Sequence, residues 1–151
     1  MNELVSLPTL HFPTYPARIR SNTLSLEIYD EVRAQWVALT PEEWVRQNCL
    51  HWLLSRGFPK GRCSVERRLG RTGMRYDLLW LDSRLSPFLL VECKAPSIAV
   101  STDTLRQSQW YNLTLRAPYV LLTNGLTTYC AAVDREGYVD ILPDIPNYPS
   151  S

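Results

Sequence analysis

The stretch RYDLLWLDSRLSPFLLVECK, residues 75–94, decides the fold of this 151-residue chain. Residues 75–82 and 87–93 are strongly apolar and predict two strands, and the four residues between them are few enough for a hairpin loop. Both faces of each strand carry apolar side chains, which is typical of strands that are covered on both sides. We therefore expect an antiparallel hairpin that is buried between two layers.

Asp77, Glu92 and Lys94 are the polar residues of this hairpin that can carry chemistry. Glu92 and Lys94 are two residues apart on one strand and therefore share a face. If Asp82 pairs with Pro87, the same register places Asp77 opposite Glu92, with the β-carbons roughly 4.5–5.5 Å apart. Two carboxylates at that distance repel each other, so the pair destabilises the fold unless a cation, a proton or basic neighbours offset it.

A magnesium ion would supply such a cation. Mg²⁺ is commonly bound by one or two carboxylates with waters and substrate phosphate, which fits Asp77 and Glu92, and the backbone carbonyl of Cys93 could add a ligand. Bound Mg²⁺ would polarise a phosphodiester and make hydroxide from water near neutral pH. Lys94, a compact charge, could orient that water and stabilise the charge on phosphorus. The alternative is a pair of solvated charges at a strand end.

The residues before the hairpin predict a helix and a strand. Thr40 is a good N-cap, Pro41 suits the first helical position, and Glu43 stands three residues after the cap. Gly57 ends the apolar periodicity that follows, so we expect a helix over about residues 41–56. Residues 62–69 are a weaker strand candidate.

The residues after the hairpin predict a second helix and further strands. Capping candidates at 101–103 open a helix that ends before Pro118. Residues 119–123 predict a buried strand, 127–133 its hairpin partner after the Asn124-Gly125 turn, and 138–142 an edge strand. The order helix, three strands, helix, strand, strand indicates an α/β fold in which helices flank a mixed central sheet.

The ends of the chain interrupt regular structure with proline. We expect an N-terminal arm over 1–23, a single domain over 24–142 and an extended proline-rich tail over 143–151. Within the domain, 24–29 predicts a short strand that ends at Asp30, and 31–39 is ambiguous, with one or two helical turns as its interpretation.

Composition excludes several classes of protein. A net charge of +1 argues against a protein that holds nucleic acid by charge alone. Four cysteines without a CxxC pair and two histidines without metal-ligand spacing argue against zinc and favour reduced thiols in a cytoplasmic protein. No run of eighteen apolar residues is present, so we expect no membrane span. The sixteen basic residues include only two lysines, Lys60 and Lys94, which draws attention to Lys94.

Five stretches in order carry a resemblance to a known family: residues 39–47, 75–77, 91–96, 107–112 and 123–125. Asp77 followed by Glu92-Cys93-Lys94 resembles the signature of PD-(D/E)XK nucleases, and the whole set is similar to the N-terminal nuclease domain of the restriction (R) subunit of type I restriction enzymes, in a stand-alone form. The resemblance implies a restriction-endonuclease-like αβββαβ core and a Mg²⁺-dependent phosphodiesterase that acts on DNA, with Mn²⁺ able to substitute.

The resemblance also implies further site residues. Gln107 and Tyr111 match the QxxxY motif of this branch and share a helix face; Gln107 could hold substrate or an outer water and Tyr111 a phosphate, with ordinary helix packing as the alternative. The first-helix acid of the superfamily maps to Glu43, with Glu42 as the rival, although a capping-box glutamate needs no catalytic reason. Tyr76 replaces the usual proline before the aspartate.

A cluster of arginines precedes Asp77 and could line a groove for the nucleic-acid backbone, because the guanidinium fork suits phosphate. The alternative is a solvated loop. The cluster consists of Arg67, Arg68, Arg71 and Arg75.

The sequence thus favours a metal-dependent DNA endonuclease of restriction, defence or DNA processing. Two alternatives stay open: a non-catalytic nucleic-acid-binding or assembly module that keeps the nuclease fold, and a nuclease directed at RNA. The 151 residues leave no room for the translocase of type I restriction subunits, so we expect substrate recognition to come from a motor, specificity or other recruiting partner, from a homodimer, or from the chain's own loops.

Overall fold

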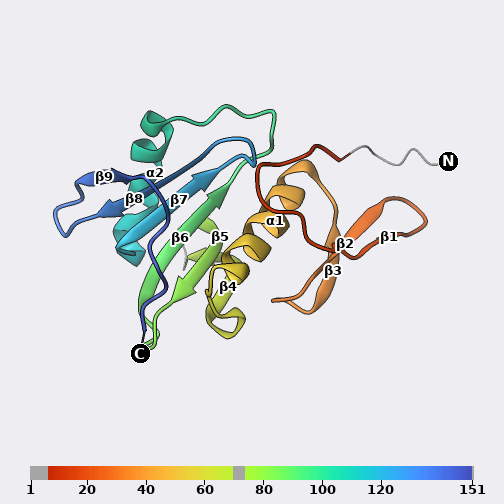
Figure 1. Ribbon diagram of the computed structural model, residues 1–151, viewed down its shortest axis with the longest axis horizontal. Helices are drawn as coiled ribbons and strands as arrows, with labels where there is room; N and C mark the ends of the chain where they lie inside the picture. Colours follow the sequence, from red (N-terminus) through yellow and green to blue (C-terminus); the bar gives the residue numbers. More distant parts are fainter. Residues whose placement is uncertain (1–6, 70–73, 151) are drawn as a thin grey trace.

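The computed structural model describes residues 7–69 and 74–150, with the side chains at 66–69, 74, 75, 110, 111 and 114 left out. The described residues form a three-stranded sheet, a six-stranded sheet and two α-helices (Figure 1). The elements in chain order are β1 (Ile19–Ser21), β2 (Leu26–Asp30), β3 (Gln35–Ala38), α1 (Pro41–Ser55), a short 3-10 helix (Lys60–Arg62), β4 (Cys63–Leu69), β5 (Met74–Leu81), β6 (Pro87–Cys93), α2 (Thr102–Leu115), β7 (Tyr119–Thr123), β8 (Thr128–Val133) and β9 (Val139–Leu142).

The large sheet is mixed, as the sequence predicts. Its strand order is β4-β5-β6-β7-β8-β9, and neighbouring strands are antiparallel except β6 and β7, which are parallel and joined through α2. A parallel pair needs such a crossover because the chain must return to the starting end of the first strand before the second strand begins. A tight turn joins only antiparallel strands. The predicted α/β class with a restriction-endonuclease-like core is therefore confirmed.

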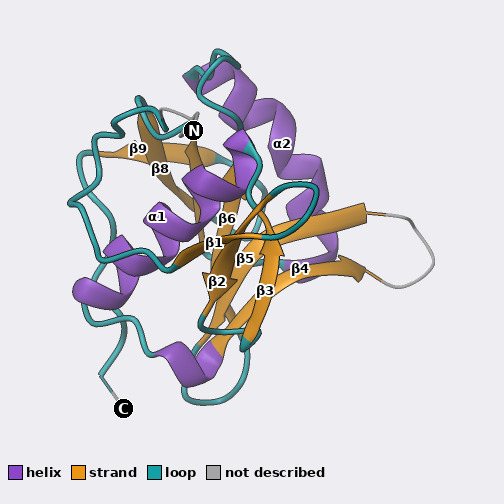
Figure 2. Ribbon diagram, turned by 90° about the vertical axis from the view of Figure 1, so that its right-hand side faces the viewer, coloured by secondary structure: helices purple, strands orange, loops and turns teal. Residues whose placement is uncertain are grey.

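The two helices cover opposite faces of the large sheet (Figure 2). On the α1 face, Val45 and Leu53 pack with the strand residues Leu78, Trp80 and Val91 in the larger core. On the α2 face, Leu105 packs with Leu79, Leu90 and Leu122, which alternate with the first set along the strands. The central hairpin is thus covered on both sides, as its apolar composition predicts.

Helix α1 begins where the sequence predicts. The Oγ1 atom of Thr40 accepts a hydrogen bond from the Glu43 N–H at 3.0 Å, and Pro41 occupies the first turn. The helix ends at Ser55, one residue before the predicted end. This cap fixes the orientation of the first turn, which carries Glu43, and Arg46 follows in the next turn.

The prediction of helical turns in residues 31–39 is wrong. The chain turns after Asp30 and returns as β3, which pairs with β2 in an antiparallel hairpin. The Oδ1 atom of Asp30 accepts hydrogen bonds from the N–H groups of Val32 and Arg33, and Ala34 adopts a positive φ of 53°. Side-chain capping of this kind stabilises a turn against a helix.

The pairing of Asp82 with Pro87 is also wrong, although the register inferred from it is correct. Leu81 pairs with Pro87, and an irregularity between Trp80 and Leu81 shifts the ladder by one residue. Asp82 belongs to the turn, where its Oδ1 atom accepts hydrogen bonds from two following N–H groups. Beyond the irregularity Leu78 pairs with Val91 in the inferred register, and the described pairing ends there, one residue short of Asp77 and Glu92.

The described parts of the predicted arm and tail pack on the domain. In the predicted N-terminal arm, Leu10 and Phe12 are buried in the larger core, and residues 19–21 form β1. In the predicted tail, Ile145 is buried and the hydroxyl of Tyr148 donates a hydrogen bond to the Leu81 carbonyl. No helix in the described part of the chain is long and apolar enough to cross a membrane.

Candidate active site

Asp77 lies in the middle of β5 and is held by two different elements. Its Oδ2 atom accepts a hydrogen bond from the Cys93 N–H of β6 at 2.8 Å, and its Oδ1 atom accepts one from Arg46 Nη2 of α1 at 2.8 Å. The side chain is 16% exposed. Asp77 therefore stands at the junction of the central hairpin and the first helix, with its carboxylate fixed at both oxygens.

Glu92 and Lys94 lie at the end of β6 and form an ion pair, with Glu92 Oε2 and Lys94 Nζ 2.9 Å apart. The two side chains are partly exposed, Glu92 at 28% and Lys94 at 36%. The hydrogen bond to Glu92 raises the pKa of Lys94, so the amine stays a cation at neutral pH. The Lys94 backbone N–H donates to the Thr123 carbonyl of β7, which fixes the chain just beyond the strand.

Cys93 stands between these two residues, and its thiol points into the larger core. A hydrogen bond with Cys49 and complete burial raise the pKa of the Cys93 thiol well above its usual value. The thiol is therefore neutral, and only the backbone of Cys93 can contribute to the site.

Arg46 is the residue that the sequence interpretation missed. It is 4% exposed and lies between two acids, with Nη1 bonded to Glu43 Oε1 and Nη2 to Asp77 Oδ1. Burial alone would lower the pKa of Arg46, but the charges of Glu43 and Asp77 outweigh burial and raise it. The repulsion expected between Asp77 and Glu92 is thus offset by two cations of the chain, Arg46 on one acid and Lys94 on the other. The spacing of three residues between Glu43 and Arg46 on a helix was the available signal.

Glu43 belongs to a buried polar network that extends away from Asp77. Gln47 Nε2 donates to Glu43 Oε2 and to Asp30 Oδ2, each at 2.9 Å. Arg33 bonds Asp30 at 2.7 Å and Glu43 at 3.3 Å. The network therefore joins the β2–β3 turn to Asp77 through Glu43 and Arg46.

The rival acids on α1 differ in their surroundings. The Glu43 side chain is 7% exposed and has cationic or amide donors at both oxygens, whereas the Glu42 side chain is 48% exposed and lies 3.5 Å from Arg46 Nη2. Glu43 is thus the buried first-helix acid, and its route to Asp77 runs through Arg46. A catalytic role for Glu43 stays a prediction.

The remaining predicted residues are not brought into the site by any described contact. Gln107 is exposed on α2. The side chain of Tyr111 lies outside the described residues, as do the side chains of Arg67, Arg68 and Arg75, whose backbones lie in β4 and β5. Arg71 lies wholly outside the described residues. Their roles stay predictions.

Asp77, Glu92 and the Cys93 carbonyl form a set of oxygen donors that fits a Mg²⁺ ion with few protein ligands. Asp77 and Glu92 offer hard carboxylate oxygens, and Cys93 offers a backbone carbonyl, which are ligands that Mg²⁺ accepts together with waters. Among the residues that the structure describes, no three acid, histidine or cysteine side chains are grouped to hold a metal by themselves. The residues therefore suit an ion that keeps several waters, and do not form an all-protein cage.

Comparison with known proteins gives one family. The model of the type I restriction enzyme R protein N terminus (HSDR_N) matches residues 41–146, which is more than half of the chain. The match begins with α1 and ends beyond β9, so it includes every residue of the Asp77, Glu92 and Lys94 site. A search of curated proteins gave no match. Because the match covers the whole six-stranded sheet and both α-helices, this chain belongs to the family of type I restriction enzyme R protein N-terminal domains.

Proposed function

We propose that this member of a restriction-related nuclease family is a Mg²⁺-dependent deoxyribonuclease that hydrolyses phosphodiester bonds within DNA. The observation that carries the proposal is the placement of Asp77 in β5 beside Glu92 and Lys94 at the end of β6, each partly accessible and each held by a charged partner. Charged groups gathered beside one another in this way are a common mark of a functional site.

Each residue has a separate role in the proposal. Asp77, Glu92 and the Cys93 carbonyl would hold Mg²⁺, which when bound polarises the phosphodiester and lowers the pKa of water. The Lys94 amine, kept protonated beside Glu92, would orient the attacking water and stabilise negative charge on the phosphate oxygens. Arg46 orients the Asp77 carboxylate.

Substrate and partners extend the proposal beyond these residues. Gln107 and Tyr111 would contact substrate, and the arginines that precede Asp77 would contact the DNA backbone. We further propose a cytoplasmic enzyme that is recruited to DNA by a motor or specificity partner or acts as a homodimer, because a net charge of +1 gives little non-specific affinity for DNA.

The test is DNA cleavage with Mg²⁺ or Mn²⁺ by the parent protein and by three variants. Lys94→Ala and Asp77→Asn should reduce cleavage of single- or double-stranded DNA by at least about 100-fold, since each removes a charge that acts in the transition state. Lys60→Ala, which removes the other lysine of the chain, should cleave like the parent. Absence of metal-dependent cleavage by the parent, alone and with candidate partners, would refute the proposal.

A non-catalytic nucleic-acid-binding module is the second candidate, and the Arg46 contact favours it. Because Arg46 and the Cys93 N–H occupy both oxygens of Asp77, a metal must compete with them. Calorimetric titration with Mn²⁺ separates the candidates: metal binding that is lost in Asp77→Asn supports the enzyme, and DNA binding without metal binding supports the module. Parallel RNA substrates test the third alternative.

A further inference from the structure

Arg46 places a positive charge directly on Asp77, one of the two carboxylates proposed to hold Mg²⁺. Its Nη2 atom donates to Asp77 Oδ1, and the Cys93 N–H donates to Oδ2, each at 2.8 Å. An ionised carboxylate has about four lone-pair sites, so two donors do not fill it. The two donors differ in charge, however. The N–H is neutral, whereas the guanidinium repels any cation that approaches Asp77.

This repulsion is strong because little water screens it. Arg46 is 4% exposed and the Asp77 side chain 16% exposed, and charges that are removed from solvent act on each other more strongly than charges on the surface. The charges of the metal and of Arg46 therefore compete for the same carboxylate.

Arg46 also has acid partners on its own helix. Nη1 bonds Glu43 Oε1, and the Nη2 atom that bonds Asp77 lies 3.5 Å from Glu42 Oε1. The Glu42 side chain is 48% exposed, so it is not fixed by packing on all sides. The guanidinium can therefore stay compensated within α1 when its contact with Asp77 is broken.

The charges around Asp77 sum to a formal value of −2. Besides the hydrogen bond to Glu92, the charges of Asp77 and Glu42 raise the pKa of Lys94, so the ion pair of β6 lies within electrostatic reach of the group around Arg46. Four carboxylates and two cations are thus gathered: Glu42, Glu43, Asp77, Glu92, Arg46 and Lys94. Arg33 and Asp30, which continue the network, cancel each other. One divalent cation would balance the group.

We propose that Arg46 is a stand-in cation, which bonds Asp77 while the metal site is empty and releases it, keeping Glu43 and Glu42, when a divalent ion binds. The inference rests on the proposed function, since it takes Asp77 and Glu92 as the metal ligands. Arg46 is then a positioning residue that weakens metal binding and keeps the empty site folded. Such competition is reciprocal: loss of Arg46 strengthens metal binding, and the metal restores stability that is lost with Arg46.

The test is calorimetric titration of the full chain with Mn²⁺. In Arg46→Met the dissociation constant should fall at least about tenfold relative to the parent, because a full charge next to a metal ligand is removed. If Arg46 serves only to orient Asp77, the same variant binds Mn²⁺ more weakly, and that result would overturn the proposal.

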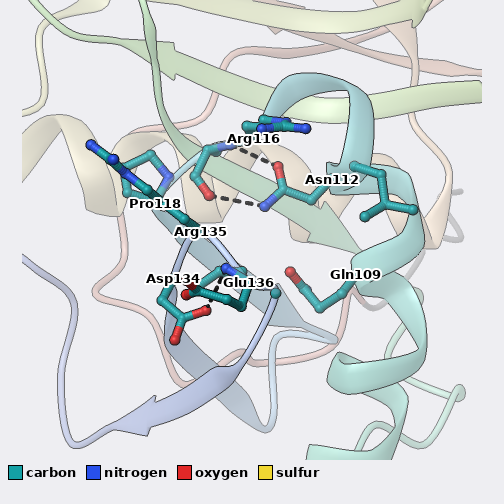
Figure 3. A pocket seen from close by; sticks show the side chains of 11 residues that line it. Gln109, Asn112, Arg116, Pro118, Asp134, Arg135 and Glu136 are labelled. Carbon is teal, nitrogen blue, oxygen red and sulfur yellow. Dashed lines mark hydrogen bonds between the residues drawn. The ribbon is translucent and has the colours of Figure 1, made fainter.

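Arg135→Met is the matched control, because it makes the same change of charge elsewhere. Arg135 lines a cavity between α2 and the β8–β9 loop (Figure 3), and this loop lies at the opposite end of the sheet from Glu92, because β8 runs antiparallel to β6 and β7. This variant should bind Mn²⁺ like the parent. A gain in affinity equal to that of Arg46→Met would mean that net charge alone sets metal binding, against the proposal.

Stability gives a second measurement. Saturating Mn²⁺ should raise the free energy of unfolding in urea more for Arg46→Met than for the parent. Where Arg46→Met does not fold, Arg46→Lys takes its place: its single ammonium cannot bond Glu43 and Asp77 as the guanidinium fork does, so Mn²⁺ should still bind more tightly than to the parent.

The outcomes separate this inference from the proposed function. If neither the parent nor the Arg46 variants bind Mn²⁺, the proposed metal site fails and the inference fails with it. If the parent binds Mn²⁺ and Asp77→Asn does not, but the folded Arg46 variants bind it no more tightly than the parent, only the inference fails.

Discussion

Arg46 is the residue on which the arrangement of the candidate site depends most directly. It is nearly inaccessible to solvent and carries its positive charge between two carboxylates, Glu43 and Asp77. A buried cation between two acids is compensated only while both contacts are made, because the low local dielectric strengthens each attraction and also each repulsion. Arg46 therefore couples the position of α1 to the position of the Asp77 carboxylate.

Replacement of Arg46 by methionine should strongly destabilise the protein. The Arg46→Met variant keeps an unbranched side chain but leaves Glu43 and Asp77 without their shared cation. The free energy of unfolding should fall by about 3–5 kcal/mol, measured by urea denaturation.

Two further variants separate charge from packing in the same measurement. Arg46→Lys retains the charge but loses the fork that bonds two acids at once, so its loss should be intermediate. Adding Glu43→Gln to Arg46→Met should restore part of the lost stability, since one of the unpaired acids is then neutral. If the double variant is as unstable as the sum of the single ones, the charge explanation is wrong.

At the scale of elements, the turn between β7 and β8 ties the N-terminal segment to the sheet. The His11 N–H donates to the Gly125 carbonyl, and Leu10 packs directly on Gly125. Gly125 has a φ of 85°, and a β-carbon built there would stand 2.7 Å from Leu10 Cδ2. This turn requires glycine for two reasons, backbone conformation and close approach.

Gly125→Ala should therefore destabilise the protein more than the same substitution at a glycine that has a positive φ but no close neighbour. We expect a loss of about 2–4 kcal/mol in the free energy of unfolding, from left-handed strain and overpacking together. Gly57→Ala is the matched control, because Gly57 has a φ of 94° and no atom within 4 Å of the added β-carbon. Its loss should be about 1–2 kcal/mol.

A second background tests the cause of the difference. Leu10→Ala opens the space beside Gly125, so in that background Gly125→Ala should be no more harmful than Gly57→Ala. Equal losses for the two glycine variants in the parent background would show that the Leu10 contact does not matter.

At the scale of the whole molecule, charged and polar side chains connect the three-stranded sheet to α1, and α1 in turn packs on the six-stranded sheet. Asp30, fully buried at the end of β2, bonds Arg33 and Gln47, and Gln47 continues to Glu43. In Figure 1 the three strands β1 to β3 lie beside α1, which stands between them and the large sheet. Protonation of Asp30 would weaken the contact between these parts.

Acid should therefore destabilise the protein partly through Asp30. Burial alone would raise the pKa of Asp30, but hydrogen bonds and charge from Arg33, with the hydrogen bond from Gln47, outweigh burial and lower it. The unfolded chain, where an aspartate has a pKa of about 3.9, binds the proton more readily than the folded chain. The stabilisation is thus complete above about pH 4 and is lost as the pH falls through the lower folded value.

The measurement is urea denaturation of the parent and of Asp30→Asn over a series from about pH 3 to pH 7. Asp30→Asn should be less stable near neutral pH and should lose less stability on acidification, because its side chain does not ionise. Parallel pH profiles for the two proteins would exclude Asp30 as a source of the acid sensitivity.

Local rules of sequence were enough to predict the main elements of the domain. Capping by Thr40, the apolar hairpin and the Asn124-Gly125 turn act between near neighbours, and the structure forms α1, β5, β6, β7 and β8 within one or two residues of the predicted bounds. The strand β3, which pairs with the predicted strand β2, was missed because a side-chain cap at Asp30 competes with a weak helical pattern.

What the sequence by itself determined is the order of helices and strands and the presence of Asp77, Glu92 and Lys94 on the central hairpin. Only the tertiary structure decided which charges compensate one another. Arg46 and Asp77 are 31 residues apart, and their contact arises from the packing of α1 against the sheet. The same holds for Asp30 with Gln47 and for Gly125 with Leu10. Such contacts are set by the joint packing of several elements, and no local propensity specifies them.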